Sequence, residues 1–134
     1  MTLRCRWLGL AVVVTFLTSL AGCQHKPNAV SPLYVNLSYN GGACQQNGSS
    51  GVIDVEAGQQ VIYQGATAIN QFQVQFVTCP FSSCPVNSPN GSPVNAGAPI
   101  AGTTGNTYYY GGLTIGNQQC NQMGSMGLRI KPGP

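Results

Sequence analysis

The sequence predicts an all-β protein: a single β-sandwich of about seven short strands arranged in antiparallel or mixed sheets. Three observations indicate this class. Apolar and polar residues alternate along several short runs, which is the period of a strand with one buried face. Turn-forming pairs such as Asn40-Gly41 and Asn47-Gly48 separate the runs. No run has the apolar spacing of an amphipathic helix.

The expected strands follow one another from residue 33 to residue 131. In the first, Leu33, Val35 and Leu37 share one face. The clearest alternation lies in 71–76, where two phenylalanines and a valine alternate with three glutamines. Shorter runs occupy 53–56, 61–63, 108–110, 113–115 and 128–131. Gly111-Gly112 separates the run over 108–110 from the run over 113–115.

The stretch 80–106 interrupts this rhythm. It holds Pro80, Pro85, Pro89, Pro93 and Pro99 among Ser, Asn and Gly residues. Proline cannot donate to the ladder of a central strand, so a long surface loop is expected here. This loop is either a tolerated insertion or a binding loop, because long ordered loops often carry function.

The first 23 residues have the order of a secretory signal. Arg4 and Arg6 precede an almost unbroken apolar run over 7–20, which is too short to span a bilayer comfortably. The tetrad Leu20-Ala21-Gly22-Cys23 then resembles the lipobox of bacterial lipoproteins, in which the cysteine is lipid-modified and becomes the first mature residue. The alternative is an ordinary secreted protein in which Cys23 has no special role.

The lipobox resemblance implies an arrangement in three parts. Residues 1–22 would be a signal peptide, 23–31 a tether acylated at Cys23, for example with palmitate, and 32–131 the sandwich domain. The protein would then sit in the cell envelope, with the membrane as a partner through its lipid. Gln24 follows the cysteine, and by resemblance to enterobacterial sorting it favours the outer membrane of a Gram-negative bacterium. Whether the domain faces the periplasm or the outside stays open.

Charge excludes one class of partner. After removal of the leader, Lys26, Arg129 and Lys131 face Asp54 and Glu56, so the charged side chains sum to +1. So small a charge gives no electrostatic basis for binding nucleic acid.

Four cysteines remain for the domain: Cys44, Cys79, Cys84 and Cys120. An even set in a small exported domain suggests two disulfides, for which three connectivities are possible. The turn-prone spacer between Cys79 and Cys84 makes their local pairing the simplest choice, and Cys44 would then pair with Cys120. A four-thiolate metal site is the alternative, although such sites usually draw on two short cysteine pairs.

The order of the runs suggests a family. A Val-Glu-Ala-Gly-Gln turn at Val55–Gln59 follows the early strands, the strand over 72–78 precedes the irregular stretch, and a cysteine-containing loop precedes the final Leu-Arg-Ile-Lys run. This order, over about residues 32–131, resembles the cupredoxin-like sandwich of small bacterial lipoproteins. An immunoglobulin-like strand order is the alternative topology. The cupredoxin-like order places the exit of the first strand and the last loop at one pole, which supports pairing Cys44 with Cys120.

The resemblance does not extend to the copper ligands. Blue-copper members carry a histidine where this chain has 70–73, and a Cys, His and Met in the last loop. Here 70–73 lacks histidine, Met123 stands where the second histidine would be, and the sole histidine, His25, lies in the tether. Such copper sites need two imidazoles and a thiolate, so no copper site of this type and no cofactor is expected.

Catalysis is not expected either. The domain has no histidine to pair with a nucleophile, and Asp54 and Glu56 point the same way from a strand, toward solvent. Two weaker candidates remain. Met123 and Met126 could bind copper(I) through their thioethers, or simply fill apolar gaps. The triplet 108–110 puts at least one tyrosine outward, where it could bind a glycan or an envelope protein, or be an ordinary strand residue.

The sequence therefore predicts a lipid-anchored cell-envelope protein that is not an enzyme and acts as a structural or interaction module. A copper(I)-handling or degenerate redox domain is the alternative.

Overall fold

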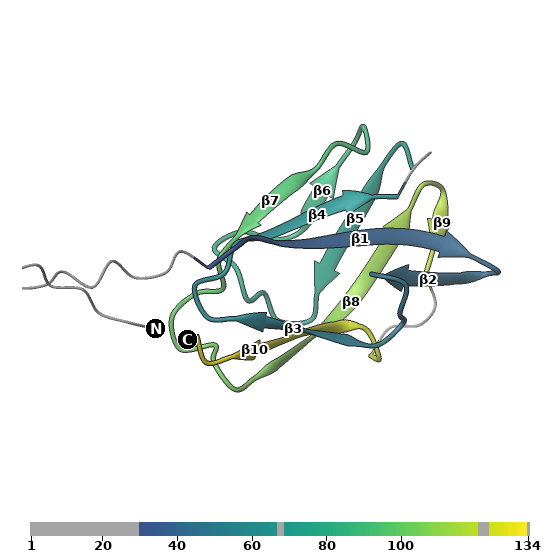
Figure 1. Ribbon diagram of the computed structural model, residues 1–134. Helices are drawn as coiled ribbons and strands as arrows, with labels where there is room; N and C mark the ends of the chain where they lie inside the picture. Colours follow the sequence, from purple (N-terminus) through teal and green to yellow (C-terminus); the bar gives the residue numbers. More distant parts are fainter. Residues whose placement is uncertain (1–29, 67–68, 121–123, 134) are drawn as a thin grey trace, which may run out of the picture.

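The computed structural model describes residues 30–66, 69–120 and 124–133, which form a β-sandwich (Figure 1). The predicted all-β sandwich is confirmed, because two sheets pack around one core. The strands of these ranges are β1 (Leu33–Asn40), β2 (Ala43–Gln46), β3 (Val52–Glu56), β4 (Val61–Gly65), β5 (Phe72–Phe76), β6 (Val86–Ser88), β7 (Val94–Gly97), β8 (Thr107–Ile115), β9 (Gln118–Gln119) and β10 (Gly127–Lys131).

The smaller sheet has the strand order β2-β1-β4-β7, and the larger has β3-β10-β8-β5-β6, with β9 beside β8. Both sheets are mixed, because β1 runs parallel to β4 and β10 runs parallel to β3, whereas the other pairs are antiparallel. The chain leaves the smaller sheet after β2 and enters the larger one at β3. In the part of the chain that the structure describes, no helix is long and apolar enough to cross a membrane.

The core between the sheets follows the alternation of the sequence. On β5, Phe72, Val74 and Phe76 are buried while the glutamines between them are exposed. On β1, Val35 and Leu37 are fully buried. Side chains from both sheets meet in this one core.

The expectation of one long loop over 80–106 needs correction. Two short strands lie within it: β6 pairs with β5 and β7 pairs with β4, both antiparallel. The prolines do not prevent this pairing because they flank the strands. Pro85 precedes β6, Pro89 follows it, and Pro93 precedes β7. Each strand therefore keeps the backbone donors that its ladder needs.

The two expected runs over 108–110 and 113–115 are one strand. β8 passes through both glycines, and its register with β5 shifts where Phe76 pairs with Tyr110 and Gln75 pairs with Gly112. Gly111 is thus the extra residue of a β-bulge. The bulge restores the alternation, so that Tyr110, Leu113 and Ile115 all point into the core.

Candidate functional site

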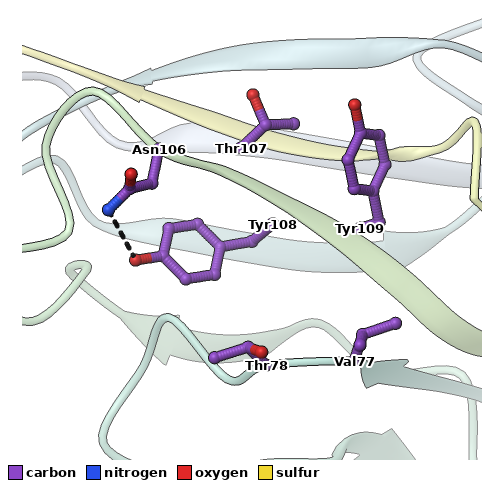
Figure 2. Close-up of a pocket in the computed structure, with 6 residues that line it drawn as sticks. All are labelled: Val77, Thr78, Asn106, Thr107, Tyr108 and Tyr109. Atoms are coloured by element: carbon purple, nitrogen blue, oxygen red, sulfur yellow. Dashed lines mark hydrogen bonds between the residues drawn. The ribbon is translucent and has the colours of Figure 1, made fainter.

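A shallow pocket of about 340 Å³ opens where β8 begins and the chain leaves β5. It is lined by Val77 and Thr78 after β5 and by Asn106, Thr107, Tyr108 and Tyr109 at the start of β8, a set that we call the tyrosine groove (Figure 2). Beyond Tyr109, whose carbonyl accepts a hydrogen bond from Val77 N at 3.0 Å, the two segments diverge toward Thr78 and Thr107. This divergence opens the groove.

The side chains of the tyrosine groove combine apolar surface with uncharged polar groups. Val77 is 74% exposed and Tyr109 is 42% exposed, so both present apolar surface to solvent. Figure 2 shows Tyr108 on the side of β8 toward Thr78, while Thr107 and Tyr109 project from the other side. Asn106 Nδ2 donates to the hydroxyl of Tyr108 at 3.4 Å. The groove therefore offers ring surface beside hydroxyl and amide groups.

A second hollow, of about 310 Å³, lies toward the other end of the same strands. We call it the amide groove, and its lining includes Gln71, Gln73, Asn87, Pro89 and Thr114. Across the sheet, Gln73 is in register with Asn87 on one side and with Thr114 on the other. Three uncharged polar side chains thus form a row over β8, β5 and β6.

Charged side chains are absent from both grooves. Among residues 30–66, 69–120 and 124–133, the only Asp, Glu, Lys, Arg or His residues are Asp54, Glu56, Arg129 and Lys131. All four lie on β3 and β10, the part of the larger sheet away from β5 and β6, and Arg129 is the cross-strand partner of Thr107 on β8. The outer surface of β5, β6 and β8, which we call the uncharged face, carries none.

Asp54 and Glu56 are both exposed on β3, as the sequence predicts, and Asp54 is paired with two cations. Asp54 Oδ1 accepts a hydrogen bond from Arg129 Nε at 2.7 Å, and Asp54 Oδ2 lies 2.5 Å from Lys131 Nζ. The hydrogen bond from Arg129, followed by that from Lys131, lowers the pKa of Asp54 from 3.8 to about 2. This carboxylate stays ionised near neutral pH and is unsuited to general acid catalysis.

The four domain cysteines form the two expected pairs. Cys44 is joined to Cys120, with their Cα atoms 5.7 Å apart, and Cys79 to Cys84, at 6.1 Å. Cys44 belongs to β2 of the smaller sheet, and Cys120 follows β9, with its N–H donating to Leu113 O of β8 at 2.8 Å. The first pair therefore links the two sheets. The second closes the segment between β5 and β6.

The structure gives little support to copper(I) binding by Met123 and Met126. Met126 is 2% exposed and belongs to the core, so its thioether would have to leave that core to reach a metal ion near the surface. Met123 lies outside the described residues, as do Cys23 and the expected signal peptide. In the described ranges, no three or more His, Cys, Asp and Glu side chains group together in a way that could hold a metal.

A buried chain of hydrogen bonds lies between the sheets and was not predicted from the sequence. Gln46 Nε2 donates to Gly51 O at 2.6 Å and to Gly127 O at 2.9 Å. Gln46 Oε1 then accepts from the hydroxyl of Tyr110 at 2.5 Å, which leaves the Tyr110 oxygen to accept from Tyr63 at 3.1 Å. Burial raises the pKa of both tyrosines, so they are neutral. One signal in the sequence could have located Gln46: if Cys44 points into the core, the alternation of a strand places Gln46 on the same buried face.

No protein-family model matches the chain, and a search of curated proteins finds no similar sequence.

Proposed function

We propose that this protein is a lipid-anchored, non-catalytic interaction module of the bacterial cell envelope. In this proposal Cys23 holds the chain at a membrane, and the tyrosine groove contacts an envelope partner. The observation that carries the second part is the pair Val77 and Tyr109, which are joined by a backbone hydrogen bond and whose side chains are 74% and 42% exposed. Exposed apolar patches with polar rims mark interaction sites.

The scaffold of the proposal is a cupredoxin-like sandwich without a copper centre. The strand orders β2-β1-β4-β7 and β3-β10-β8-β5-β6, with one parallel pair in each sheet, support the resemblance. The exit of β1 and the segment before β10 lie near each other, since Cys44 and Cys120 are paired. With that thiol paired and Met126 in the core, the geometry favours binding by the surface over copper handling.

The anchor is tested by fatty-acid labelling and fractionation. Labelled fatty acid should be incorporated into the wild type and not into Cys23→Ala, and the variant should leave the membrane fraction, because a multiply acylated cysteine holds a protein far more firmly than one chain does. A variant that stays in the membrane fraction as fully as the wild type overturns the anchor.

The contact is tested separately by co-sedimentation. Purified protein with the Cys23→Ala change is added to envelopes from cells that lack the gene, and the bound fraction is compared with that of a form also carrying Val77→Ser and Tyr109→Ala. We expect binding that these two changes abolish. Tyr34→Ala is the matched control, because Tyr34 is 50% exposed and lies on β1 of the other sheet. Equal loss with Tyr34→Ala, or no binding at all, overturns the contact.

A further inference from the structure

We propose that the uncharged face binds a neutral polysaccharide, laid along β8 and β5 from the tyrosine groove to the amide groove. The proposal rests on the interaction module described above and names the class of its partner.

Within the described ranges, charge is confined to two strands of the larger sheet, β3 and β10. The four charged side chains of the described ranges lie on the adjacent strands β3 and β10, and Asp54 is paired with both cations. An anionic polymer needs unpaired Lys or Arg side chains along its path. The uncharged face offers none, so electrostatic complementarity favours a ligand without charge.

The uncharged face is long enough for several sugar units. Along β8 it runs from Tyr109 to Thr114, which at the rise of a strand is roughly 17 Å. Gln73 and Gln75 on β5 and Asn87 on β6 point the same way, because each alternates with buried residues. The two grooves lie at opposite ends of this strip.

The strip is low and open. Gly112 is the cross-strand partner of Gln75, and Gly127 is the partner of Tyr109, so neither position raises a side chain beside its neighbour. A Cβ on Gly127 would lie 2.2 Å from Tyr108 O, so this position is closed to larger residues. An open strip suits a polymer chain, whereas small ligands are usually held in enclosed cavities.

The side chains match the two surfaces of a sugar. A pyranose ring has an apolar C–H face, against which the ring of Tyr109 can lie, and hydroxyl groups around its edge. Gln73, Asn87 and Thr114 can each donate and accept hydrogen bonds, as a hydroxyl-rich ligand requires. A protein partner would more usually meet a larger apolar centre than Val77 and Tyr109 provide.

The test is a pull-down of the full-length protein, purified in detergent, on insoluble cellulose, curdlan and starch, with alginate and heparin beads as anionic probes. We expect retention on at least one neutral polysaccharide, unaffected by salt, and none on the anionic beads. Tyr109→Ala should weaken binding about 3- to 10-fold, the usual range for one aromatic contact. Gln73→Ala should weaken it as well, and Tyr34→Ala should leave it unchanged.

Two results overturn the polysaccharide. One is failure on every neutral polysaccharide; the other is retention that salt removes. Envelope co-sedimentation separates this failure from failure of the module itself. Binding that survives protease treatment of the envelopes supports a glycan. If protease abolishes the binding and the binding still depends on Tyr109, the partner is a protein. That result supports the interaction module and contradicts the polysaccharide.

Discussion

Gln46 occupies a place in the core where a polar side chain must satisfy every hydrogen-bonding group it has. Both protons of its amide go to carbonyl oxygens, of Gly51 and Gly127, which can only accept. Its oxygen is therefore fixed toward Tyr110, whose hydroxyl must donate. The direction of this chain of hydrogen bonds follows from Gln46. It crosses to Tyr110 on the larger sheet and ends at Tyr63 on β4, in the same sheet as Gln46.

This direction predicts unequal costs for two similar changes. Tyr110→Phe leaves Gln46 without its donor and Tyr63 without its acceptor, and should lower the free energy of unfolding by about 2–4 kcal/mol. Tyr63→Phe removes only the terminal donor and should cost about 1 kcal/mol. Urea unfolding of both variants measures the difference. If Tyr63→Phe costs as much as Tyr110→Phe, the hydrogen bonds do not run in this direction.

At the scale of the strand, β3 and β10 hold the charges of the described chain in a parallel pair. Asp54 is in register with Arg129, and Lys131 lies two residues further along the same face. The pairs are exposed to solvent, so they fix the registration of two strands more than they stabilise the fold.

These pairs predict a loss of stability in acid. Asp54 has a pKa of about 2 in the folded protein, below its ordinary value of 3.8, so the folded state binds fewer protons between those values. The contribution of Asp54 to the free energy of unfolding is complete above its ordinary pKa of 3.8 and is lost as the pH falls toward 2. Thermal unfolding of Asp54→Asn should therefore differ from the wild type at pH 6 and converge with it near pH 2.

Glu56→Gln is the matched control for this prediction. Glu56 lies on the same strand and the same exposed face, and forms no ion pair within the described ranges. Its variant should follow the wild type across the acid range. If Glu56→Gln differs from the wild type at pH 6 and converges with it near pH 2 as much as Asp54→Asn does, the effect does not come from the two cations.

Strands with clear alternation could be predicted from the sequence, and short or interrupted ones could not. β5 is evident because its buried and exposed residues differ in kind. β6 and β7 are hidden because prolines beside a strand look, in a sequence, like prolines within it. The bulge at Gly111 is hidden for a related reason: two glycines suggest a turn, and only the pairing with β5 shows the strand to be continuous.

The candidate site was predictable in part. The tyrosine triplet indicates an outward ring, and the structure identifies Tyr109 as that residue. The position of Val77 beside Tyr109 depends on the pairing of segments that are distant in the sequence, and no local pattern reveals it. The gathering of the charged residues on two adjacent strands likewise depends on the pairing of β3 with β10, which are distant in the sequence.

At the scale of the whole molecule, the two disulfides differ in the length of chain that they close. Cys44 and Cys120 are 76 residues apart, and Cys79 and Cys84 are five apart. Loop entropy predicts a stabilisation of about 4 kcal/mol for the first and about 2 kcal/mol for the second. The pair Cys44→Ser and Cys120→Ser should therefore lower the midpoint of thermal unfolding more than Cys79→Ser with Cys84→Ser.

The connectivity itself is checked by peptide mapping of the exported protein without reduction. We expect two linked peptide pairs, one holding Cys44 and Cys120 and the other holding Cys79 and Cys84. Free thiols in the native protein, or a crossed pair, contradict this arrangement.

The bond between the sheets also determines how the molecule would carry force. A membrane anchor pulls on the chain ahead of β1, in the smaller sheet, whereas a ligand on the uncharged face pulls on β5 and β8 in the larger one. Tension between them would enter at Leu33, follow the backbone to Cys44 and cross directly to Cys120. At most the twelve residues from Leu33 to Cys44, which include the buried Val35 and Leu37, could be drawn out before the disulfide passed the load to the larger sheet.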